Sequence, residues 1–314
     1  MIVVYLLLFL LSLLVVIKSA DFAIYHSGGL ARGLHISRYV VGFLLIAIIS
    51  ILPETFIAIS SSMQGIPSFG LGALFGSNVA DLTLVFAIII LFSARNIKVD
   101  SQIVKKSLTY ILILAMPIVL GWNGYYSRFE GIALILSGVA FYAFLLQKSS
   151  KQEAKKTKRR FSWKHFLLLL TSMALLLVAS TFTVKFAVLF ADGLQISPII
   201  VAMLFVGLGT TLPELFFSLK AVKDNHDGLA LGDILGTVIT DATIVVGILA
   251  IISPFAFNPR IVYVTGAFML VAAIILLYFM KTGKKISKRE GLILLFFYIV
   301  FLLTEFMVGR FFSV

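Results

Sequence analysis

The chain has no cysteine, only 14 acidic residues and a low share of charged residues overall. The absence of cysteine excludes disulfides, thiolate metal sites, iron–sulfur clusters and cysteine nucleophiles. Charged residues make up 13% of the 314 positions and apolar residues 61%, whereas soluble domains average about 25% and about 45–50%. An ordinary soluble domain is therefore excluded. Apolar runs of roughly 17–25 residues recur along the chain and match the hydrocarbon core of a bilayer, which predicts an all-α integral membrane protein.

Ten apolar segments, each bounded by charged or turn residues, predict ten transmembrane helices. They span residues 2–17, 39–62, 69–94, 103–121, 129–147, 164–184, 196–219, 229–252, 261–280 and 289–309. With the N-terminus outside, 22 of the 26 Lys and Arg residues fall in inner loops. Because cytoplasmic loops carry an excess of Lys and Arg, this distribution predicts a multi-pass protein of the cell membrane with both termini outside. The first run lacks the basic start and small-residue cleavage site of a signal peptide, so we expect it to be retained.

These inner loops explain the formal net charge of +12 without a nucleic-acid partner. The expected partners are membrane lipid and the transported ions, and we expect the chain to function as a monomer. The most basic segment, residues 148–163, is predicted to be a cytoplasmic loop between a first five-helix repeat at 1–147 and a second at 164–314. We interpret this loop as solvated and topology-setting rather than as a site for anionic lipid or a regulator.

A shift of 160 residues aligns the chain with itself without a gap. It places Leu52-Pro53-Glu54 on Leu212-Pro213-Glu214. Further matches are Gly33 to Ser37 on Gly193 to Ser197, Gly72 on Gly232, Gly76-Ser77 on Gly236-Thr237, Asp81 on Asp241 and Thr83 on Thr243. Shared apolar composition would not align Pro, Glu, Gly and Asp in this way, so the sequence indicates a duplication. Five spans in each half, an odd number, predict an inverted repeat, the architecture of many secondary transporters.

Four acidic residues lie well inside predicted spans: Glu54, Asp81, Glu214 and Asp241. Each would cost roughly 2.5–3.5 kcal/mol at the bilayer centre, so their charge must be compensated. Every Lys and Arg lies at a predicted span end or in a loop. Protons or cations are therefore the expected partners. The alternative is that the acids are protonated and only hold helices together through hydrogen bonds.

The residues around these acids suit a hard cation. Pro53 and Pro213 have no N–H, so each predicts a helix break one turn before a Glu, where freed carbonyl groups point toward the carboxylate. Hydroxyl residues precede the four acids by four positions and share their helix face: Ser50, Ser77, Thr210 and Thr237. Glycines that would let these helices approach closely are Gly72, Gly76, Gly232 and Gly236. Carboxylate, hydroxyl and carbonyl oxygens favour calcium or sodium over zinc or copper.

Other polar residues give weaker signals. Asp233 shares a helix face with Thr237 and Asp241, and it either lines a mouth of the site or caps the start of the eighth span. Glu305 has no counterpart in the repeat and is expected at the outer interface. The histidines show no metal-binding spacing and are expected to be solvated or interfacial: His26, His35, His165 and His226.

Leu-Pro-Glu after small hydroxyl residues, followed 27 positions on by Asp after Gly-Ser or Gly-Thr, resembles the α-repeats of the sodium/calcium exchanger family within the cation/calcium antiporters. The resemblance is strongest to the prokaryotic ten-helix type, covers nearly the full chain and is most specific at residues 42–83 and 202–243. It implies the sodium/calcium exchanger fold, in which Glu54 and Glu214 would be the calcium ligands and would also bind sodium. The flanking ion sites would then be formed by Ser50, Ser77, Thr210, Thr211, Thr237 and Asp241.

The first repeat departs from the family pattern. It lacks the glycine before the hydroxyl, has Ile51 where the second repeat has Thr211, and has Asp81 where prokaryotic sodium/calcium members often carry Asn. One sodium site would therefore lose a ligand. The four-carboxylate arrangement is similar to that of potassium-dependent or proton-coupled relatives, so the resemblance implies calcium transport and leaves the coupling ion open.

The leading hypothesis is a secondary active antiporter that exchanges calcium for sodium by alternating access at a central carboxylate site. Alternatives are coupling to protons or potassium, and transport of another divalent cation such as magnesium or manganese. A cation channel is a further alternative, because acidic rings also select cations, but an inverted repeat with a proline-broken helix in each half favours alternating access. No nucleophile–base pair or nucleotide motif is present, so we expect neither an enzyme nor a bound cofactor.

Overall fold

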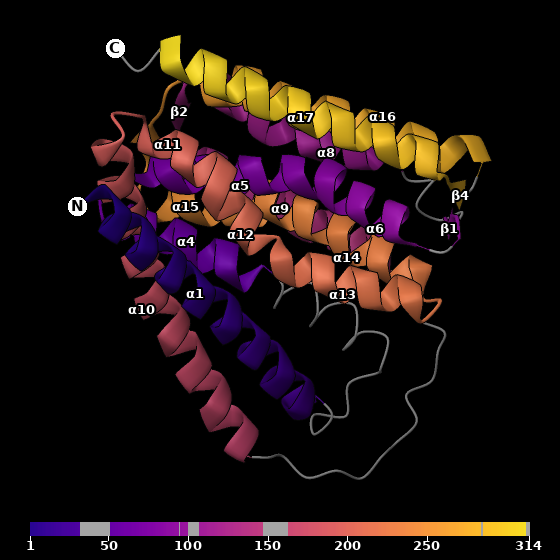
Figure 1. Cartoon of the computed structure of the whole chain (residues 1–314), viewed down its shortest axis with the longest axis horizontal. Coiled ribbons are helices and arrows are strands. Elements are labelled where there is room, and N and C mark those ends of the chain that lie inside the picture. Colours follow the sequence, from indigo (N-terminus) through magenta and orange to yellow (C-terminus); the bar gives the residue numbers. More distant parts are fainter. Residues whose placement is uncertain (32–50, 94, 100–106, 147–162, 284, 312–314) are drawn as a thin grey trace.

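The structure is a computed structural model that describes residues 1–31, 51–93, 95–99, 107–146, 163–283 and 285–311 (Figure 1). Within them the chain is mostly helical, as its composition predicts. The helices are α1 (Ile2–Ala31), α4 (Leu52–Met63), α5 (Pro67–Ala80), α6 (Phe86–Phe92), α8 (Ser107–Leu120), α9 (Arg128–Leu146), α10 (Trp163–Gly193), α11 (Pro198–Val201), α12 (Gly207–Thr210), α13 (Leu212–Lys223), α14 (Asp227–Thr240), α15 (Val246–Ile252), α16 (Ala267–Gly283) and α17 (Lys288–Phe311). The π-helical turns are η2 (Asp81–Val85), η4 (Ala202–Val206), η5 (Asp241–Val245) and η6 (Ile261–Gly266), and η3 (Gly121–Asn123) is a 3-10 turn. Two antiparallel ribbons pair β1 (Ile97–Lys98) with β4 (Lys285–Ile286) and β2 (Tyr125–Tyr126) with β3 (Phe255–Ala256).

Seven helical stretches in the described part of the chain are long and apolar enough to cross a membrane. They are Ile2–Ala23, Pro67–Phe92, Trp163–Gly193, Pro198–Lys223, Asp227–Ile252, Ile261–Thr282 and Lys288–Val308. Ser107–Asn123 is a shorter apolar helix. The second predicted span, residues 39–62, is described only from residue 51 onward. The many apolar helices predicted from the sequence are thus present, and the number ten stays a prediction.

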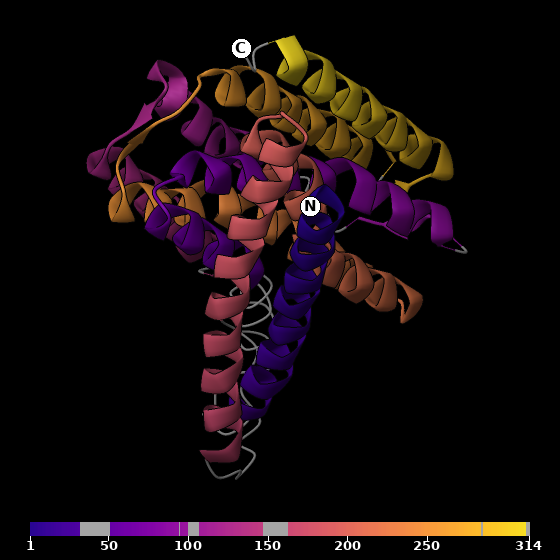
Figure 2. The same cartoon turned by 60° about the vertical axis from the view of Figure 1, so that its left-hand side comes forward.

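Helices α1 and α10 run side by side and stand obliquely to the other helices (Figures 1 and 2). Both extend beyond their predicted ends at residues 17 and 184. Lys18 does not end α1, because its side chain is 74% exposed and pairs with Asp21 one turn further on. Between the two helices the rings of Phe9 and Phe190 stack with centroids 6.4 Å apart.

Two helical stretches form the centre of the molecule, α5–η2–α6 and α14–η5–α15. In each, 83% of the residues in the most apolar window are buried, against 33% in α1 and in α10. In Figure 1 they lie between α16 and α17 on one side and α4 and α13 on the other, and these helices contact them. An apolar helix that other helices cover on all sides belongs to the interior of the protein, whereas one that is little covered faces lipid.

The two halves have the same local structure at positions 160 residues apart. The pairs α4 and α13, α5 and α14, η2 and η5, and α6 and α15 begin and end at residues related by that shift. Gly65 and Asn225, in the turns between the first two pairs of helices, both have left-handed φ angles, 75° and 62°. In Ser127–Glu130 and again in Ser287–Glu290, the Glu side chain accepts a hydrogen bond from the Ser backbone N–H, at 2.7 and 2.6 Å. The repeated sequence therefore specifies repeated turns and caps as well as repeated helices.

The two β-ribbons lie at opposite ends of the molecule (Figure 1). β2 and β4 correspond in the repeat, since Tyr125 and Lys285 are 160 positions apart, but β2 pairs with β3 at one end and β4 pairs with β1 at the other. Segments that correspond in sequence are thus at opposite ends of the long axis. Each ribbon joins one segment from each half.

Glycines let the two halves meet backbone to backbone at the centre. A Cβ atom added to Gly76 of α5 would lie 2.7 Å from the Cα of Met203 in η4. A Cβ atom added to Gly207 of α12 would lie 2.8 Å from the backbone nitrogen of Ser77 in α5. Neither distance leaves room for a side chain, so this crossing requires glycine on both helices.

The other predicted glycine contacts are described for the first half. A Cβ at Gly72 would lie 2.8 Å from a methyl group of Ile199, so the predicted close approach is confirmed at Gly72 as well as Gly76. At Gly236 the hydroxyl of Tyr142 is the nearest described atom, at an ordinary 3.4 Å. Gly232 is half-buried. The close approach predicted for the second half stays a prediction, because the repeat places its partners within residues 32–50, outside the described part of the chain.

We expect Gly76→Ala to lower the midpoint of thermal unfolding by a few degrees, because overpacking a close contact costs about 1–3 kcal/mol. Gly228→Ala is the matched control, since no atom lies within 4 Å of its added Cβ. Thermal unfolding of the purified proteins in detergent measures both. An unchanged midpoint in Gly76→Ala, or an equal drop in the control, would contradict the backbone contact.

Candidate functional site

The proline-broken helix is confirmed in the second half. Thr211 separates α12 from α13, and Pro213 lies in the first turn of α13. In the first half, Ile51 has nearly the same backbone angles as Thr211, with φ and ψ of −78° and 0° against −77° and −7°. α4 begins directly after Ile51, but the preceding residues, including the predicted ligand Ser50, lie outside the described part of the chain.

Glu54 and Glu214 are the third residues of α4 and α13. A carboxylate in the first turn of a helix is stabilised by the unpaired backbone N–H groups and by the positive end of the helix dipole. The two side chains are only 3% and 1% exposed. Glu54 lies within hydrogen-bond reach of the Thr210 hydroxyl, which belongs to the other half of the chain. The helix breaks thus bring groups from both halves together.

Asp81 and Asp241 each begin a π-helical turn. Two residues later, the hydroxyls of Thr83 and Thr243 donate to the carbonyl four residues back, at 2.5 and 2.6 Å. Such a bond competes with the regular helical pattern at that carbonyl, and π-turns are frequent at functional sites. The hydrophobic pattern of the sequence does not predict these turns. The repeated Asp-x-Thr is the signal that accompanies them.

The four predicted intramembrane acids have no counter-charge among the described residues. Their side chains are at most 3% exposed. The ion pairs in that part of the chain lie elsewhere: Lys18–Asp21, Arg95–Asp227 and Arg260–Glu305. The oxygens that also lack a hydrogen-bond partner there are one of Glu54, one of Asp81, and both of Glu214 and of Asp241. Because an unpaired buried carboxylate is costly, this arrangement requires protons or cations.

The four acids lie close enough together to interact. Glu214 and Asp241 are each within electrostatic reach of Glu54 and Asp81. No three Asp, Glu or His side chains of the described residues, however, gather tightly enough to hold one metal ion. An ion bound in this geometry would therefore combine at most two carboxylates with hydroxyl, carbonyl or water oxygens. Calcium accepts such a mixed set, since it takes about 6–8 oxygen ligands in flexible geometry.

The predicted hydroxyl ligands that the structure describes are all buried. They are Ser77, Thr210, Thr211 and Thr237, and none is more than 2% exposed. The hydroxyls of Ser77, Thr210 and Thr211 donate to backbone carbonyls one turn back, at 2.9, 3.1 and 3.0 Å. A hydroxyl that uses its proton in this way keeps its oxygen lone pairs available for a cation. Ile51, 7% exposed, has no such oxygen at the position that corresponds to Thr211.

Asp233 does not cap a helix. α14 begins at Asp227, so Asp233 lies inside the helix and the capping interpretation is wrong. Its side chain is 5% exposed, and neither carboxylate oxygen has a hydrogen-bond partner among the described residues. Asp233 therefore resembles the four site acids in burial and in lack of a partner.

Tyr142 of α9 is a further residue near these acids, and it is not predicted from the sequence. Its hydroxyl lies 2.9 Å from the carbonyl oxygen of Gly236 and 2.5 Å from the hydroxyl of Thr240. Both partners are on α14, one turn and two turns after Asp233. The repeat gives no signal for this residue, because Leu302 occupies the corresponding position.

Glu305 is buried and paired within the protein, and its expected position at the outer interface stays a prediction. It is 1% exposed and accepts hydrogen bonds from Arg260 at 2.7 Å and from the Thr265 hydroxyl at 2.5 Å. Arg260 lies 45 positions earlier, before η6, and a separation of that size leaves no mark on local sequence pattern. The protein itself therefore supplies a counter-charge for this acid.

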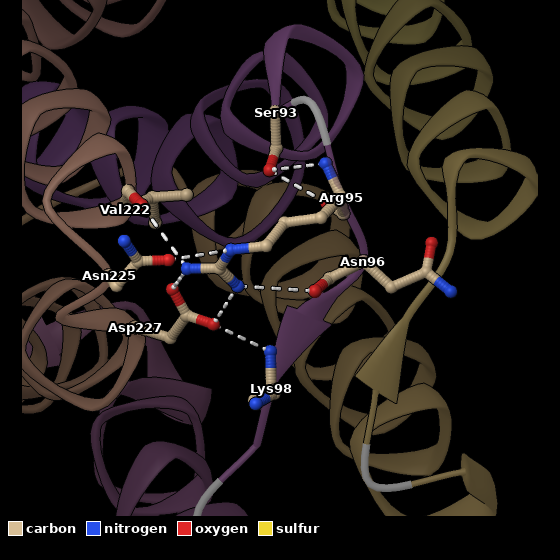
Figure 3. A network of polar contacts seen from close by, with 7 residues as sticks. All are labelled: Ser93, Arg95, Asn96, Lys98, Val222, Asn225 and Asp227. Carbon is tan, nitrogen blue, oxygen red and sulfur yellow. Dashed lines mark hydrogen bonds and ion pairs between the residues drawn. The ribbon is translucent and has the colours of Figure 1, made fainter.

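Asp227 is also paired within the protein (Figure 3). Arg95 donates to both of its carboxylate oxygens, at 2.6 and 2.7 Å, and the backbone N–H of Lys98 donates to one of them at 2.8 Å. Arg95 also donates to the Asn225 side chain at 3.0 Å. This network fixes the segment between α6 and β1 to the start of α14.

The predicted histidine environments are partly correct. His226 is exposed, whereas His26 is buried and its Nδ1 lies 3.1 Å from the Nδ1 of His165. His35 lies outside the described residues. The contact between His26 and His165 joins α1 to α10, so it belongs to the packing of these two helices.

The sequence profile of the family described as "Sodium/calcium exchanger protein" matches residues 4–147 and 164–307. Among curated proteins, the chain is 25% identical over 353 residues to the sodium/calcium exchanger MaX1 of Methanosarcina acetivorans, covering 98% of this chain and 100% of the relative. It is 29% identical over 294 residues to the uncharacterized membrane protein MJ0091 of Methanocaldococcus jannaschii, covering 93% and 95%. It is 26% identical over 283 residues to the inner membrane protein YrbG of Escherichia coli, covering 85% and 86%.

Among solved structures, the chain is similar to the sodium-calcium exchanger NCX_Mj. The structure soaked with 2.5 mM Na+ and 10 mM Sr2+ matches with a TM-score of 0.68 at 25% identity, covering 96% of this chain and 98% of that one. The structure soaked without Na+ and Ca2+ matches with a TM-score of 0.64. The similarity of fold thus extends over nearly the whole chain.

We expect Glu305→Gln to destabilise the protein, whereas Glu214→Gln should not. Neutralising Glu305 leaves Arg260 largely buried without its partner, and because Arg260 is 18% exposed we expect a loss of about 1–3 kcal/mol rather than the full cost of a buried charge. Glu214 has no cationic partner among the described residues to lose. Thermal unfolding midpoints compare the two variants. Equal loss in both would show that Glu214 also has a protein partner.

Proposed function

The chain belongs to the sodium/calcium exchanger protein family, and from this membership we propose that it is a secondary active antiporter that exchanges calcium for sodium across the cell membrane. Membership confirms the resemblance drawn from the α-repeat motifs and makes the chain a multi-pass membrane transporter rather than an enzyme. The observation that carries the proposal is the group of buried acids at the helix breaks and π-turns, which have no counter-charge in the described residues.

In the proposed mechanism, calcium is the cargo and binds between the two halves. Glu54 and Glu214 each reach the ion from the first turn of a helix, and sodium ions compete for the same carboxylates. The groups proposed to complete the calcium and sodium sites are Ser50, Ser77, Thr210, Thr211, Thr237, Asp81 and Asp241. Ser50 lies outside the described residues, and the other six are buried. The hydroxyls of Ser77, Thr210 and Thr211 already donate their protons to backbone carbonyls, which agrees with this assignment.

The same burial explains why transport would be an exchange. A site without ions leaves several carboxylate charges unpaired in a region of low dielectric, which is unfavourable. Conformations that carry the site from one face of the membrane to the other are therefore accessible when cations are bound and suppressed when the site is empty. Each transported calcium must then be replaced by other cations before the site returns.

We propose that the chain consists of two inverted five-helix repeats, ten helices in all, with residues 1–147 and 164–314 as the halves. Support comes from the identical element boundaries 160 residues apart and from the position of the corresponding strands β2 and β4 at opposite ends of the molecule. Two halves of opposite direction give the site equivalent routes to both faces, which is the basis of alternating access. A channel would need no such symmetry.

The proposed orientation has both termini outside and the basic segment 148–163 in the cytoplasm, because most Lys and Arg residues then lie inside. The turn between α13 and α14, which carries Lys220 and Lys223 at the end of α13, is on the cytoplasmic side in this orientation. We propose a monomer as the functional unit, since the site is assembled from both halves of one chain.

Ile51 favours a second candidate for the coupling ion. A buried isoleucine in the place of a hydroxyl removes one sodium ligand, and Asp81 adds a carboxylate, so coupling to protons or potassium is the alternative. Purified protein in liposomes decides between them. Uptake of radioactive calcium is measured under an imposed sodium, potassium or proton gradient in turn. Uptake driven by sodium alone supports the proposal, uptake driven only by one of the others supports the alternative, and downhill calcium flux without a counter-ion would indicate a channel.

We expect Glu54→Gln and Glu214→Gln each to abolish calcium exchange, with a loss of at least about a hundredfold, because each removes a ligand charge from a divalent ion. Glu290→Gln is the matched control, since this Glu caps a helix through an oxygen that Gln retains. Calcium uptake into sodium-loaded liposomes measures the effect. Near-normal uptake in either site variant would refute the assignment of the two glutamates.

We expect Ile51→Ser to raise the apparent sodium affinity of exchange, because it restores a hydroxyl at the position that corresponds to Thr211. The reciprocal variant Thr211→Ile should lower sodium affinity. The sodium concentration that half-maximally drives calcium exchange is the quantity to measure, and we expect shifts of about threefold or more in opposite directions. An unchanged sodium dependence in both variants would mean that this position does not face an ion.

A further inference from the structure

Asp233 is the buried acid that the proposed exchange site does not use. It lies on α14 on the same helix face as Thr237 and Asp241, one and two turns before them. Its position in the repeat corresponds to Ala73, so the first half has no matching acid. With a rise of about 1.5 Å per residue, Asp233 lies about 9 Å along the helix from Asp227 and about 12 Å from Asp241. It therefore lies between one end of the molecule and the central acids.

The surroundings of Asp233 do not neutralise it. The side chain is 95% buried, since it is 5% exposed, and both oxygens lack a hydrogen-bond partner in the described part of the chain. Arg95, which lies beside the start of the same helix, is held by both oxygens of Asp227 (Figure 3). None of the ion pairs among the described residues includes Asp233.

Asp233 lies within electrostatic reach of two of the four central acids. Its charge acts on Asp81 and Glu214, and also on the hydroxyl group of Tyr142. Asp241, eight residues further along the same helix, instead interacts with Glu54 and Asp81. Asp233 thus neighbours two of the four site acids, and along its own helix it lies nearer than Asp241 to the α13–α14 turn.

We propose that Asp233 forms an additional cation subsite, on the side of the α13–α14 turn, through which calcium or a monovalent cation passes between the central carboxylates and that face of the membrane. This inference rests on the proposed exchange function. A carboxylate on the route to the central site raises the local cation concentration. It also offers one charged ligand to an ion that has dissociated from the central carboxylates. The opposite route has the buried methyl group of Ala73 at the corresponding position.

The subsite makes the two faces of the transporter unequal. On the face with Asp233, which is cytoplasmic in the proposed orientation, calcium should bind with a lower KM than on the opposite face. The inverted repeat alone would give both faces similar routes. The difference between the faces therefore measures the contribution of this one acid.

The subsite is tested by calcium uptake into vesicles in which the protein has one or the other orientation. The calcium KM is determined separately for each face. Asp233→Asn should raise the calcium KM about tenfold on the α13–α14 face and change it less than about twofold on the other. Asp233→Glu, which keeps the charge, should stay within about threefold of the wild type on both faces. Asp224→Asn removes an exposed acid from the same turn and should change neither value, so it controls for surface charge.

Each other outcome overturns the subsite. Unchanged KM values in Asp233→Asn would mean that the acid is off the route, and an equal rise on both faces would make it a central ligand. If the Asn variant does not fold, Asp233→Ser removes the same charge with a smaller side chain. Equilibrium dialysis of the solubilised protein with radioactive calcium is independent of transport, and Asp233→Asn should weaken binding about tenfold. Absence of exchange in the wild type would overturn the proposed function, whereas normal exchange with unchanged binding in the variant would overturn only the subsite.

Discussion

A carboxylate inside a membrane needs a positive partner, and the architecture of this protein follows from where that partner comes from. Glu305 and Asp227 pair with arginines of the chain itself, and these pairs fix helix ends in place. The four site acids and Asp233 have no such partner among the described residues. In the proposed function their counter-charge comes from solution as protons or ions, and the cost of the unpaired carboxylates would favour cation binding. The same residue types would thus serve structure where the protein supplies the cation and, in the proposed function, transport where it does not.

The site acids can act together because the backbones around them are brought unusually close. Gly76 and Gly207 allow α5 of one half to contact η4 and α12 of the other without intervening side chains. Because the helix breaks at Thr211, Glu214 lies in the first turn of α13. Asp241 begins the π-turn η5, which follows α14. Side chains on unbroken, well-separated helices could not converge in this way. Close packing and local irregularity are therefore requirements of the same site.

The sequence predicts features that are encoded locally or by the repeat. The Leu-Pro-Glu motif predicts the break before Pro213, and the 160-residue shift predicts which helices correspond. Features that depend on distant contacts are not predictable in this way: the pairing of Glu305 with Arg260 joins residues 45 positions apart, and Tyr142 reaches α14 from a helix whose repeat mate carries leucine there. Helix ends are also misjudged where a charged side chain such as Lys18 remains exposed and lets the helix continue.

The two β-ribbons have a mechanical consequence. Each ribbon pairs a strand of the first half with a strand of the second, and the two ribbons lie at opposite ends of the long axis. Because the two halves are joined at both ends, they cannot separate freely about a hinge. A large displacement of one half relative to the other would have to break backbone hydrogen bonds in one of the ribbons. Helices α1 and α10 belong to neither ribbon, and they contact each other extensively. Neither ribbon therefore ties α1 or α10 directly to the central helices.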